Sequence, residues 1–144
     1  MPNFEIMKIT KNILIVLLLI ANSCSKDASV IPYVTVNFTI YVTDPLYINL
    51  NSVGGWMYVT GGSRGILLYR KSIDEIMAYD RHCTYEPENT CGQIEVESNN
   101  FTAVDSCCFS KFEIDNGMAI QTPATLSLKQ YRTTFDGTIL HVYN

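Results

Sequence analysis

Met77-Ala78-Tyr79-Asp80-Arg81-His82-Cys83-Thr84 is an extended, largely apolar segment that runs straight into a cysteine. A second cysteine-bearing stretch, Asp105-Ser106-Cys107-Cys108-Phe109-Ser110, follows further along the chain. Together with Cys91, these stretches hold four of the five cysteines in the 144 residues. Two cysteine-bearing loops in one small chain indicate a metal centre, a redox centre or a pair of disulfides. Cysteine chemistry is therefore the central question.

Outside these loops the chain is dominated by short, alternating or β-branched segments, which are typical of strands. The expected strands are 34–42, 56–59, 66–70, 77–80, 94–97, 101–104, 111–114, 125–133 and 138–142, with a short extended piece at 47–50. Gly61-Gly62, Asp115-Asn116-Gly117 and Asp136-Gly137 supply turns, because Gly and Asn accept positive φ. Many short strands separated by turns predict an all-β sandwich or small barrel.

The N-terminus has the layout of a secretory signal. Lys8 and Lys11 precede an apolar run over residues 13–21, which is too short for a membrane-spanning helix of about 20 residues. Residues 19–24, Leu-Ile-Ala-Asn-Ser-Cys, resemble a bacterial lipobox, and residues 25–27 resemble the start of surface lipoproteins of the Bacteroidetes group. We therefore expect a signal peptide over 1–23, a lipid on Cys24, a tether over 24–32 and one domain over 33–144.

The expected lipid defines the localisation and the class of partner. Acyl chains on Cys24 would hold the protein on a membrane without a transmembrane segment, since each buried methylene contributes roughly 0.8 kcal/mol. We expect a lipid-anchored protein of the bacterial cell envelope, at the outer membrane or surface rather than the inner membrane. Removal of residues 1–23 leaves eight basic and thirteen acidic residues, a net charge of −5. Such a chain does not suit nucleic acid, whose binding needs clustered positive charge.

The order of features from Gly62 to Tyr143 resembles a Rieske-type domain. Residues 66–70 and 77–84 are similar to the strand pair that leads into the first cluster loop of the family, which reads Cys-Thr-His. Residues 105–112 stand where the family has its second loop, Cys-x-x-His, and residues 136–140 follow its closing strands. The resemblance implies a Rieske-like small antiparallel β sandwich or barrel with two cysteine-bearing loops.

The family holds a [2Fe–2S] cluster with two thiolates on one iron and two imidazoles on the other. Under the resemblance, Cys83 matches the first thiolate and Tyr85 stands at the first imidazole position. Asp105 stands at the second thiolate position and Cys108 at the second imidazole position. These four residues are the candidate ligands if a cluster is retained. A tyrosine phenol, with a pKa of about 10, is a poor cluster ligand. We therefore expect no cofactor, with a [2Fe–2S] cluster or zinc as the alternative.

Disulfides are the expected use of the cysteines. Without Cys24, four cysteines remain, an even number for an oxidising compartment. The adjacent Cys107 and Cys108 are not expected to pair with one another, because a vicinal disulfide is strained, and two pairings remain open. The resemblance favours Cys91–Cys107, which match two extra cysteines that brace the cluster loops in many members, together with Cys83–Cys108. Each bridge would contribute about 3 kcal/mol.

A tetrahedral zinc or an all-thiolate iron–sulfur cluster on the same four cysteines is the competing interpretation. The spacing does not favour it, because Cys83 and Cys91 lie eight positions apart and Cys107 and Cys108 are adjacent. Structural zinc sites usually place paired cysteines two to four residues apart.

No catalytic constellation is visible, so no catalytic residue is assigned and the protein is not expected to be an enzyme. The chain has no Gly-x-Ser-x-Gly elbow, no His-Glu-x-x-His and no phosphate-binding loop followed by a helix. Since His82 points to the opposite face of an extended segment from Cys83, we expect it to be a surface or hydrogen-bonded core residue. We expect His141 to be structural.

Tyr85, Pro87 and Phe109 are the candidate binding residues. Under the resemblance they lie at the tips of the two loops, which in Rieske proteins dock onto an electron-transfer partner. Exposed aromatic side chains at these tips suit an envelope protein or a glycan. The sequence therefore predicts an envelope lipoprotein whose Rieske-like domain acts as a binding or structural module without a cluster. The alternative is an electron-transfer protein that carries an unusual iron–sulfur cluster or a Cys-ligated metal.

Overall fold

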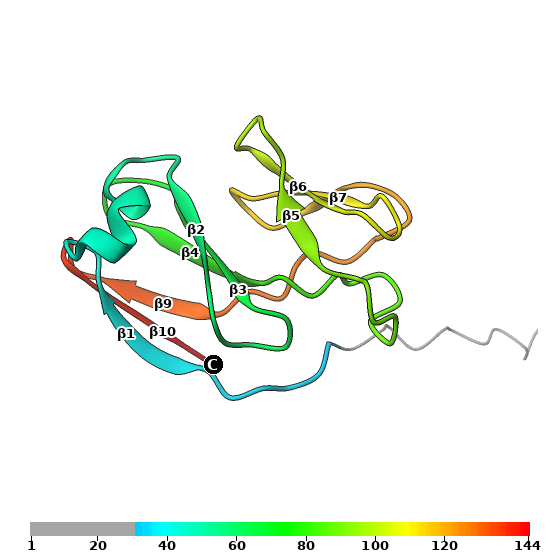
Figure 1. Ribbon diagram of the computed structural model, residues 1–144, viewed down its shortest axis with the longest axis horizontal. Helices are drawn as coiled ribbons and strands as arrows, with labels where there is room; N and C mark the ends of the chain where they lie inside the picture. The colour runs from blue at the N-terminus through cyan, green and yellow to red at the C-terminus, as the bar shows by residue number, and fades with distance from the viewer. Residues whose placement is uncertain (1–30) are drawn as a thin grey trace, which may run out of the picture.

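The computed structural model describes residues 31–144, which form antiparallel sheets and one short helix (Figure 1). The expected signal peptide over 1–23, the lipidation site Cys24 and the tether up to residue 30 lie outside the described residues. Within residues 31–144, no helix is both long and apolar enough to cross a bilayer. The predicted all-β class is confirmed.

The described part of the chain contains ten strands in three sheets. The first sheet has the order β1-β10-β9, with bounds Asn37–Tyr41, Ile139–Tyr143 and Arg132–Phe135. The second has the order β2-β3-β4, with bounds Trp56–Val59, Ile66–Arg70 and Ile76–Asp80. The third has the order β5-β6-β7-β8, with bounds Ile94–Val96, Thr102–Asp105, Lys111–Glu113 and Ala119–Gln121. A 3-10 helix, η1 (Pro45–Asn51), lies between β1 and β2 in the chain.

β3 and β4 form the centre of the molecule, because every residue of both strands is buried. Successive side chains of a strand point to opposite faces. Ile66 and Leu68 therefore enter one core, which Leu140 of β10 helps to complete. Leu67 enters a second core, together with Phe112 of β7. The second sheet is thus covered on both faces, which explains why β3 reads as a continuous apolar run rather than an alternating one.

Residues 47–50, which we expected to be extended, lie inside η1. Pro45 stands in the first turn of this helix, where its missing N–H and fixed φ are favourable. The side chain of Asp44 caps the helix by accepting a hydrogen bond from the Leu46 N–H at 2.9 Å. An Asp followed by Pro can end a strand, but it can also begin a helix, and Asp44-Pro45 begins η1.

The expected strand over 125–133 is wrong for most of its length, since β9 begins only at Arg132. The segment before β9 is a loop that nevertheless buries Ala124 and Leu128 in the second core. The Leu128 N–H donates to the Gly117 carbonyl at 2.8 Å, and Thr84 Oγ1 donates to the Leu126 carbonyl at 2.7 Å. Burial of loop side chains produced an apolar pattern that resembled a strand. β8 is a short strand that we did not expect.

Asp80, the last residue of β4, is a fully buried carboxylate that joins three segments. Its Oδ2 accepts from the Ser63 N–H at 2.7 Å and from Tyr131 Oη at 2.7 Å. Its Oδ1 accepts from the His82 N–H at 2.9 Å and the Arg64 N–H at 3.3 Å. A buried charge is tolerated only when it is paired or hydrogen-bonded. These bonds hold the β2–β3 hairpin loop and the residue before β9 against the start of the first cysteine-bearing loop.

We expect Tyr131→Phe to lower the free energy of unfolding by about 1.5–3 kcal/mol, the range for loss of a hydrogen bond to a charged group. Burial and the Asp80 carboxylate both raise the pKa of Tyr131, so its phenol remains a donor at neutral pH. Tyr79→Phe is the matched control, because the Tyr79 hydroxyl is also buried but has no hydrogen-bond partner within residues 31–144. Urea unfolding followed by Trp56 fluorescence measures both variants, and equal losses would contradict the prediction.

Candidate functional site

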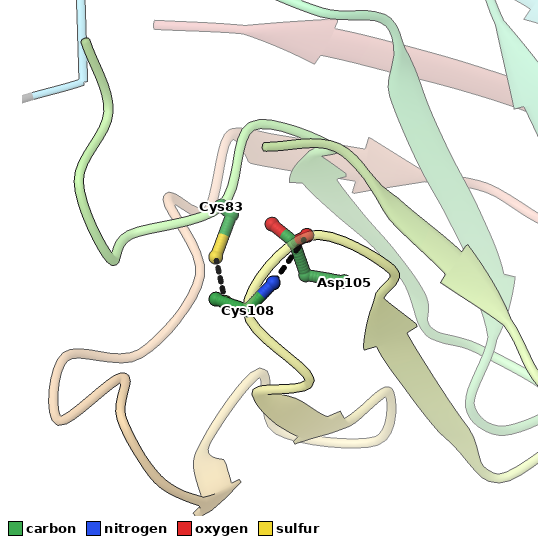
Figure 2. Close-up of side chains that lie close together, drawn as sticks. All are labelled: Cys83, Asp105 and Cys108. Carbon is green, nitrogen blue, oxygen red and sulfur yellow. Dashed lines mark hydrogen bonds between the residues drawn. The ribbon is translucent and has the colours of Figure 1, made fainter. Parts of the chain in front are cut away.

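The two cysteine-bearing loops meet at one end of the third sheet. The first cysteine loop (residues 81–93) connects β4 to β5, and the second cysteine loop (residues 106–110) connects β6 to β7. Cys83 comes from the first loop and Cys108 from the second, and their side chains face one another beside Asp105 (Figure 2). The structure therefore brings together three of the four candidate ligand residues.

One of the two expected disulfides is formed. Cys91 and Cys107 are bonded, with their Cα atoms 6.1 Å apart, and this bridge ties the two cysteine loops together. Cys83 and Cys108 are free thiols whose Sγ atoms lie 3.7 Å apart. The second expected bridge is therefore not formed in this structure, although its two sulfurs are already in contact.

Asp105, the last residue of β6, is fully buried between the two thiols and the backbone of its own loop. Its Oδ1 accepts from the Cys107 N–H at 2.7 Å and more weakly from the Cys108 N–H at 3.4 Å. Its Oδ2 is buried and has no hydrogen-bond partner within the described residues. One oxygen of Asp105 and the sulfurs of Cys83 and Cys108 lie within 4.8 Å of one another. A buried acceptor without a partner is costly, so Oδ2 is a candidate to accept a proton or to bind a cation.

Cys83 is the buried member of the thiol pair, and none of its surface reaches solvent. Burial raises the pKa of the Cys83 thiol, and the neighbouring Asp105 carboxylate raises it further. Both effects disfavour a second negative charge in an apolar, already anionic environment. Cys83 is therefore a neutral thiol at neutral pH. Cys108 is partly exposed and lies on the solvent side of the pair.

The three candidate binding residues have different environments. Phe109 is 66% exposed, so its ring lies on the surface of the second cysteine loop, and its backbone has φ +61°. The Tyr85 ring is partly buried and packs against the second core, which includes Cys83. Pro87 is buried, so it offers no docking surface. Only Phe109 fully keeps the exposed position that sequence analysis expected.

Arg64 positions the first cysteine loop, a role that sequence analysis missed. Its guanidinium donates to the carbonyls of Asn89 and Gly92, both at 2.5 Å, and makes a longer contact of 3.4 Å with the carbonyl of Pro87. A planar guanidinium can satisfy several carbonyls at once. The sequence showed only an Arg in a glycine-rich turn, and nothing in that turn indicates a partner loop so distant in the chain.

Comparison with solved structures identifies the fold. The cyanobacterial plasma membrane Rieske protein PetC3 from Synechocystis PCC 6803 aligns with a TM-score of 0.55 and 21% identity, over 76% of this chain and 100% of that chain. The fold is Rieske-like. The ferredoxin of carbazole 1,9a-dioxygenase from Nocardioides aromaticivorans IC177 aligns with a TM-score of 0.44 and 14% identity, over 64% of this chain and 86% of its own. The Sphingomonas yanoikuyae B1 ferredoxin aligns with a TM-score of 0.44 and 17% identity, over 67% and 93%. No family model and no curated protein matches the sequence.

The donor set of this Rieske-like domain does not fit a Rieske cluster, which needs two imidazoles. The chain has two histidines. His82 is buried, and its two ring nitrogens lie 2.8 Å from Ser63 Oγ and 2.8 Å from the Pro87 carbonyl. His141 lies on β10 and pairs with the Asn37 side chain at 2.8 Å. Both are occupied structural residues, and neither is in the group formed by Cys83, Asp105 and Cys108.

Stability should depend on pH through His82. Burial, and to a smaller extent the Arg64 guanidinium, lowers the pKa of His82 from its ordinary value of about 6.5. The unfolded chain then takes up this proton at a higher pH than the folded chain does. The stability that neutral His82 contributes is complete above about pH 6.5 and is lost as pH falls through the window between the ordinary and the lowered pKa.

We expect the free energy of unfolding to fall between pH 7.5 and pH 5, and His82→Gln to flatten that dependence. Urea unfolding at several pH values measures the slope. His141→Gln is the control, since His141 lies on the sheet outside both cysteine loops. If the two variants keep the same slope as the parent protein, His82 does not carry the effect.

Proposed function

We propose that this chain is an envelope lipoprotein whose Rieske-like domain carries no Rieske cluster and serves as a binding module. The observation that supports this proposal most directly is the donor set at the two cysteine loops. Two thiols and one carboxylate gather there, both histidines are engaged elsewhere, and Tyr85 packs on the core. The scaffold that would present a cluster is retained, while the imidazole ligands are absent from it.

The loops are held by means other than a cluster. The Cys91–Cys107 bridge spans a sequence separation of 16 and contributes about 3 kcal/mol by restricting the unfolded chain. Arg64 fixes the first cysteine loop through backbone carbonyls. Asp105 fixes the second through backbone N–H groups. A domain braced in this way can keep both loop tips in place for a partner without a metal to organise them.

The docking surface of this proposal is the second cysteine loop. Phe109 exposes a large aromatic side chain at the tip of a loop fixed by a disulfide. A rigid aromatic anchor loses little conformational entropy when it binds, and such residues dominate binding energies at interfaces. An envelope protein or a glycan is the class of partner that suits this tip. The lipid on Cys24 would hold the domain at the membrane of the cell envelope, at the outer membrane or surface rather than the inner membrane.

The distance between the two free thiols favours a second candidate function, the binding of a metal by cysteine ligands. Two thiolates on a tetrahedral zinc, with Zn–S bonds of ~2.3 Å, lie ~3.8 Å apart. The Sγ atoms of Cys83 and Cys108 lie 3.7 Å apart, with an Asp105 oxygen close by. A single soft cation therefore suits this trio better than a dinuclear iron–sulfur cluster with ligands on both irons. The alternative is thus a Cys-ligated metal protein, and an electron-transfer protein with an unusual cluster is the less favoured form of it.

Metal and thiol analysis of protein purified without oxygen separates these functions. We expect a colourless protein with far less than one iron or zinc per chain, and with Cys91 and Cys107 disulfide-bonded in peptide maps. A brown protein with stoichiometric iron would overturn the proposal in favour of an unusual cluster. Stoichiometric zinc that is lost in Cys83→Ser would instead establish the second candidate.

Removal of the aromatic tip should weaken binding to bacterial envelopes. We expect Phe109→Ser to reduce binding by about thirtyfold or more, because truncation of a hot-spot aromatic costs about 2 kcal/mol or more. Phe101→Ser is the matched control, since Phe101 is equally exposed, at 66%, but lies in the β5–β6 hairpin. Sedimentation with isolated envelopes of the producing bacterium measures binding.

These variants are compared in the Cys24→Ala background, so that the lipid does not mask binding by the domain. The same background tests the anchor, because Cys24→Ala should move the chain from the detergent phase to the aqueous phase on phase separation. Equal binding by the Phe109 and Phe101 variants would contradict the docking surface. Retention of Cys24→Ala in the detergent phase would contradict the anchor.

A further inference from the structure

The free thiols of Cys83 and Cys108 form a pair whose members differ in access to solvent. Their sulfurs lie 3.7 Å apart, so they must approach by about 1.7 Å to reach the ~2.05 Å of a disulfide bond. Cys83 is fully buried, whereas Cys108 is partly exposed. A disulfide from outside the domain can therefore reach only Cys108 directly. The geometry separates an attacking thiol from a resolving thiol, as stepwise thiol–disulfide exchange requires.

The attacking thiol has a partner that can stabilise its thiolate. Cys108 Sγ lies 3.1 Å from Ser110 Oγ, and Ser110 is fully buried. The Ser110 oxygen accepts the Ala124 N–H at 2.9 Å, which fixes the position of the hydroxyl group. When Cys108 loses its proton, the Ser110 hydroxyl can rotate its own proton toward the sulfur, since a hydroxyl is both donor and acceptor. The Ser110 hydroxyl is thus placed to donate a hydrogen bond to the Cys108 sulfur during the exchange.

The resolving thiol needs a base, because burial makes its ionisation unfavourable, and Asp105 is in position to supply one. The Asp105 Oδ2 is fully buried and has no hydrogen-bond partner within residues 31–144. An oxygen of this carboxylate lies within 4.8 Å of both sulfurs. The other oxygen, Oδ1, is held by backbone N–H groups, so the carboxylate keeps its orientation. A fixed, otherwise unused carboxylate beside a buried thiol is the arrangement for proton transfer.

We propose that Cys108, Cys83 and Asp105 form a thiol–disulfide exchange centre whose substrate is a disulfide of an extracytoplasmic polypeptide. The Cys108 thiolate attacks one sulfur of the substrate disulfide, forms a mixed disulfide and releases the other substrate sulfur as a thiolate. Cys83 then transfers its proton to Asp105 and attacks Cys108 Sγ, which releases the second substrate sulfur. The substrate gains two electrons and two protons: Cys108 loses its proton to water before it attacks, the first released thiolate takes a proton from water, and the second takes the Cys83 proton from Asp105. The pair loses the same number and becomes the Cys83–Cys108 disulfide.

The surroundings of the pair favour a polypeptide as substrate. Phe109 follows Cys108 directly and exposes 66% of its surface, so an apolar contact lies next to the attacking sulfur. The Cys91–Cys107 bridge holds the residue that precedes Cys108 and keeps the second cysteine loop in place during exchange. This inference rests on the proposed function, since a cluster or a metal on the same thiols would block the reaction.

Cysteine variants test the order of the two steps. The Cys24→Ala chain, with Cys91 and Cys107 bonded, is incubated with glutathione disulfide as the probe and analysed by mass spectrometry and peptide mapping. We expect Cys83→Ser to accumulate one glutathione on Cys108, because the resolving thiol is absent. We expect Cys108→Ser to remain unmodified, and the parent chain to form the Cys83–Cys108 bond without retaining glutathione.

Asp105→Asn tests the base while it keeps the side-chain oxygen that accepts the backbone N–H groups. We expect it to form the glutathione adduct at the parental rate but to resolve it about 100-fold more slowly at neutral pH, the size of effect that a general base provides. Raising the pH should speed up resolution, because hydroxide can then take the Cys83 proton in place of Asp105. Asp136→Asn is the control, since Asp136 likewise accepts backbone N–H groups in a turn but has no thiol beside it.

Iron and zinc are measured on the same samples, so that two failures can be told apart. Metal-free parent protein that forms neither adduct nor Cys83–Cys108 bond would overturn the exchange centre and leave the proposed function intact. Equal modification of Cys83 and Cys108 would also overturn it, because the order of steps depends on their unequal access. Stoichiometric metal on the thiols would overturn both proposals. The cysteine variants decide these outcomes even if Asp105→Asn does not fold.

Discussion

The buried carboxylate of Asp80 is the constraint on which the rest of the structure depends. It lies at the end of the central strand β4, and it accepts hydrogen bonds from the β2–β3 hairpin loop, from Tyr131 and from the first cysteine loop. An uncompensated charge at this depth would cost several kcal/mol, so these segments must converge on it. Gly62 shows how close the approach is, because a Cβ there would lie 2.6 Å from Asp80 Oδ2. The direction in which the chain enters the site is therefore set at Asp80.

Asp105 occupies the corresponding position at the end of β6, and its different hydrogen bonding gives it a different role. Both carboxylates are fully buried, and both precede a cysteine-bearing loop. Every oxygen of Asp80 is hydrogen-bonded, which suits a structural group. One oxygen of Asp105 has no partner within the described residues, and an oxygen of this carboxylate lies within 4.8 Å of the sulfurs of Cys83 and Cys108. An unsatisfied buried acceptor that persists in a folded domain is a candidate for chemistry. A buried aspartate thus stabilises the fold at the end of β4, and a second one provides a reactive group at the end of β6.

Several elements were predictable from the sequence because local turn and strand propensities agree with the tertiary packing there. β2 and β3 have the bounds that their patterns predicted, and the Asp115-Asn116-Gly117 turn forms with Gly117 at φ +74°. The periodicity rules predicted a strand wrongly where a loop packs on a core without pairing into a sheet. Leu128 is buried from a loop, so its apolar neighbourhood resembled a strand. Residues Pro45–Asn51 form a short 3-10 helix, kinked at Tyr47, because Asp44 and Pro45 provide a helix start that outweighs a short β-prone stretch.

By itself, the sequence determined the all-β class, the two cysteine loops and the absence of a histidine at the position of a Rieske ligand, because these follow from residue types and their order. Through the Rieske resemblance it also gave four candidate ligands, Cys83, Tyr85, Asp105 and Cys108, of which Cys83, Asp105 and Cys108 meet at the site. Tertiary structure alone decided how they meet, since access and unsatisfied hydrogen bonds depend on atoms from distant segments. The tertiary structure buries Pro87, exposes Phe109 and brings Cys91 and Cys107 together in a disulfide. It also buried Cys83 and left Cys108 partly exposed, so the two thiols differ in their access to solvent.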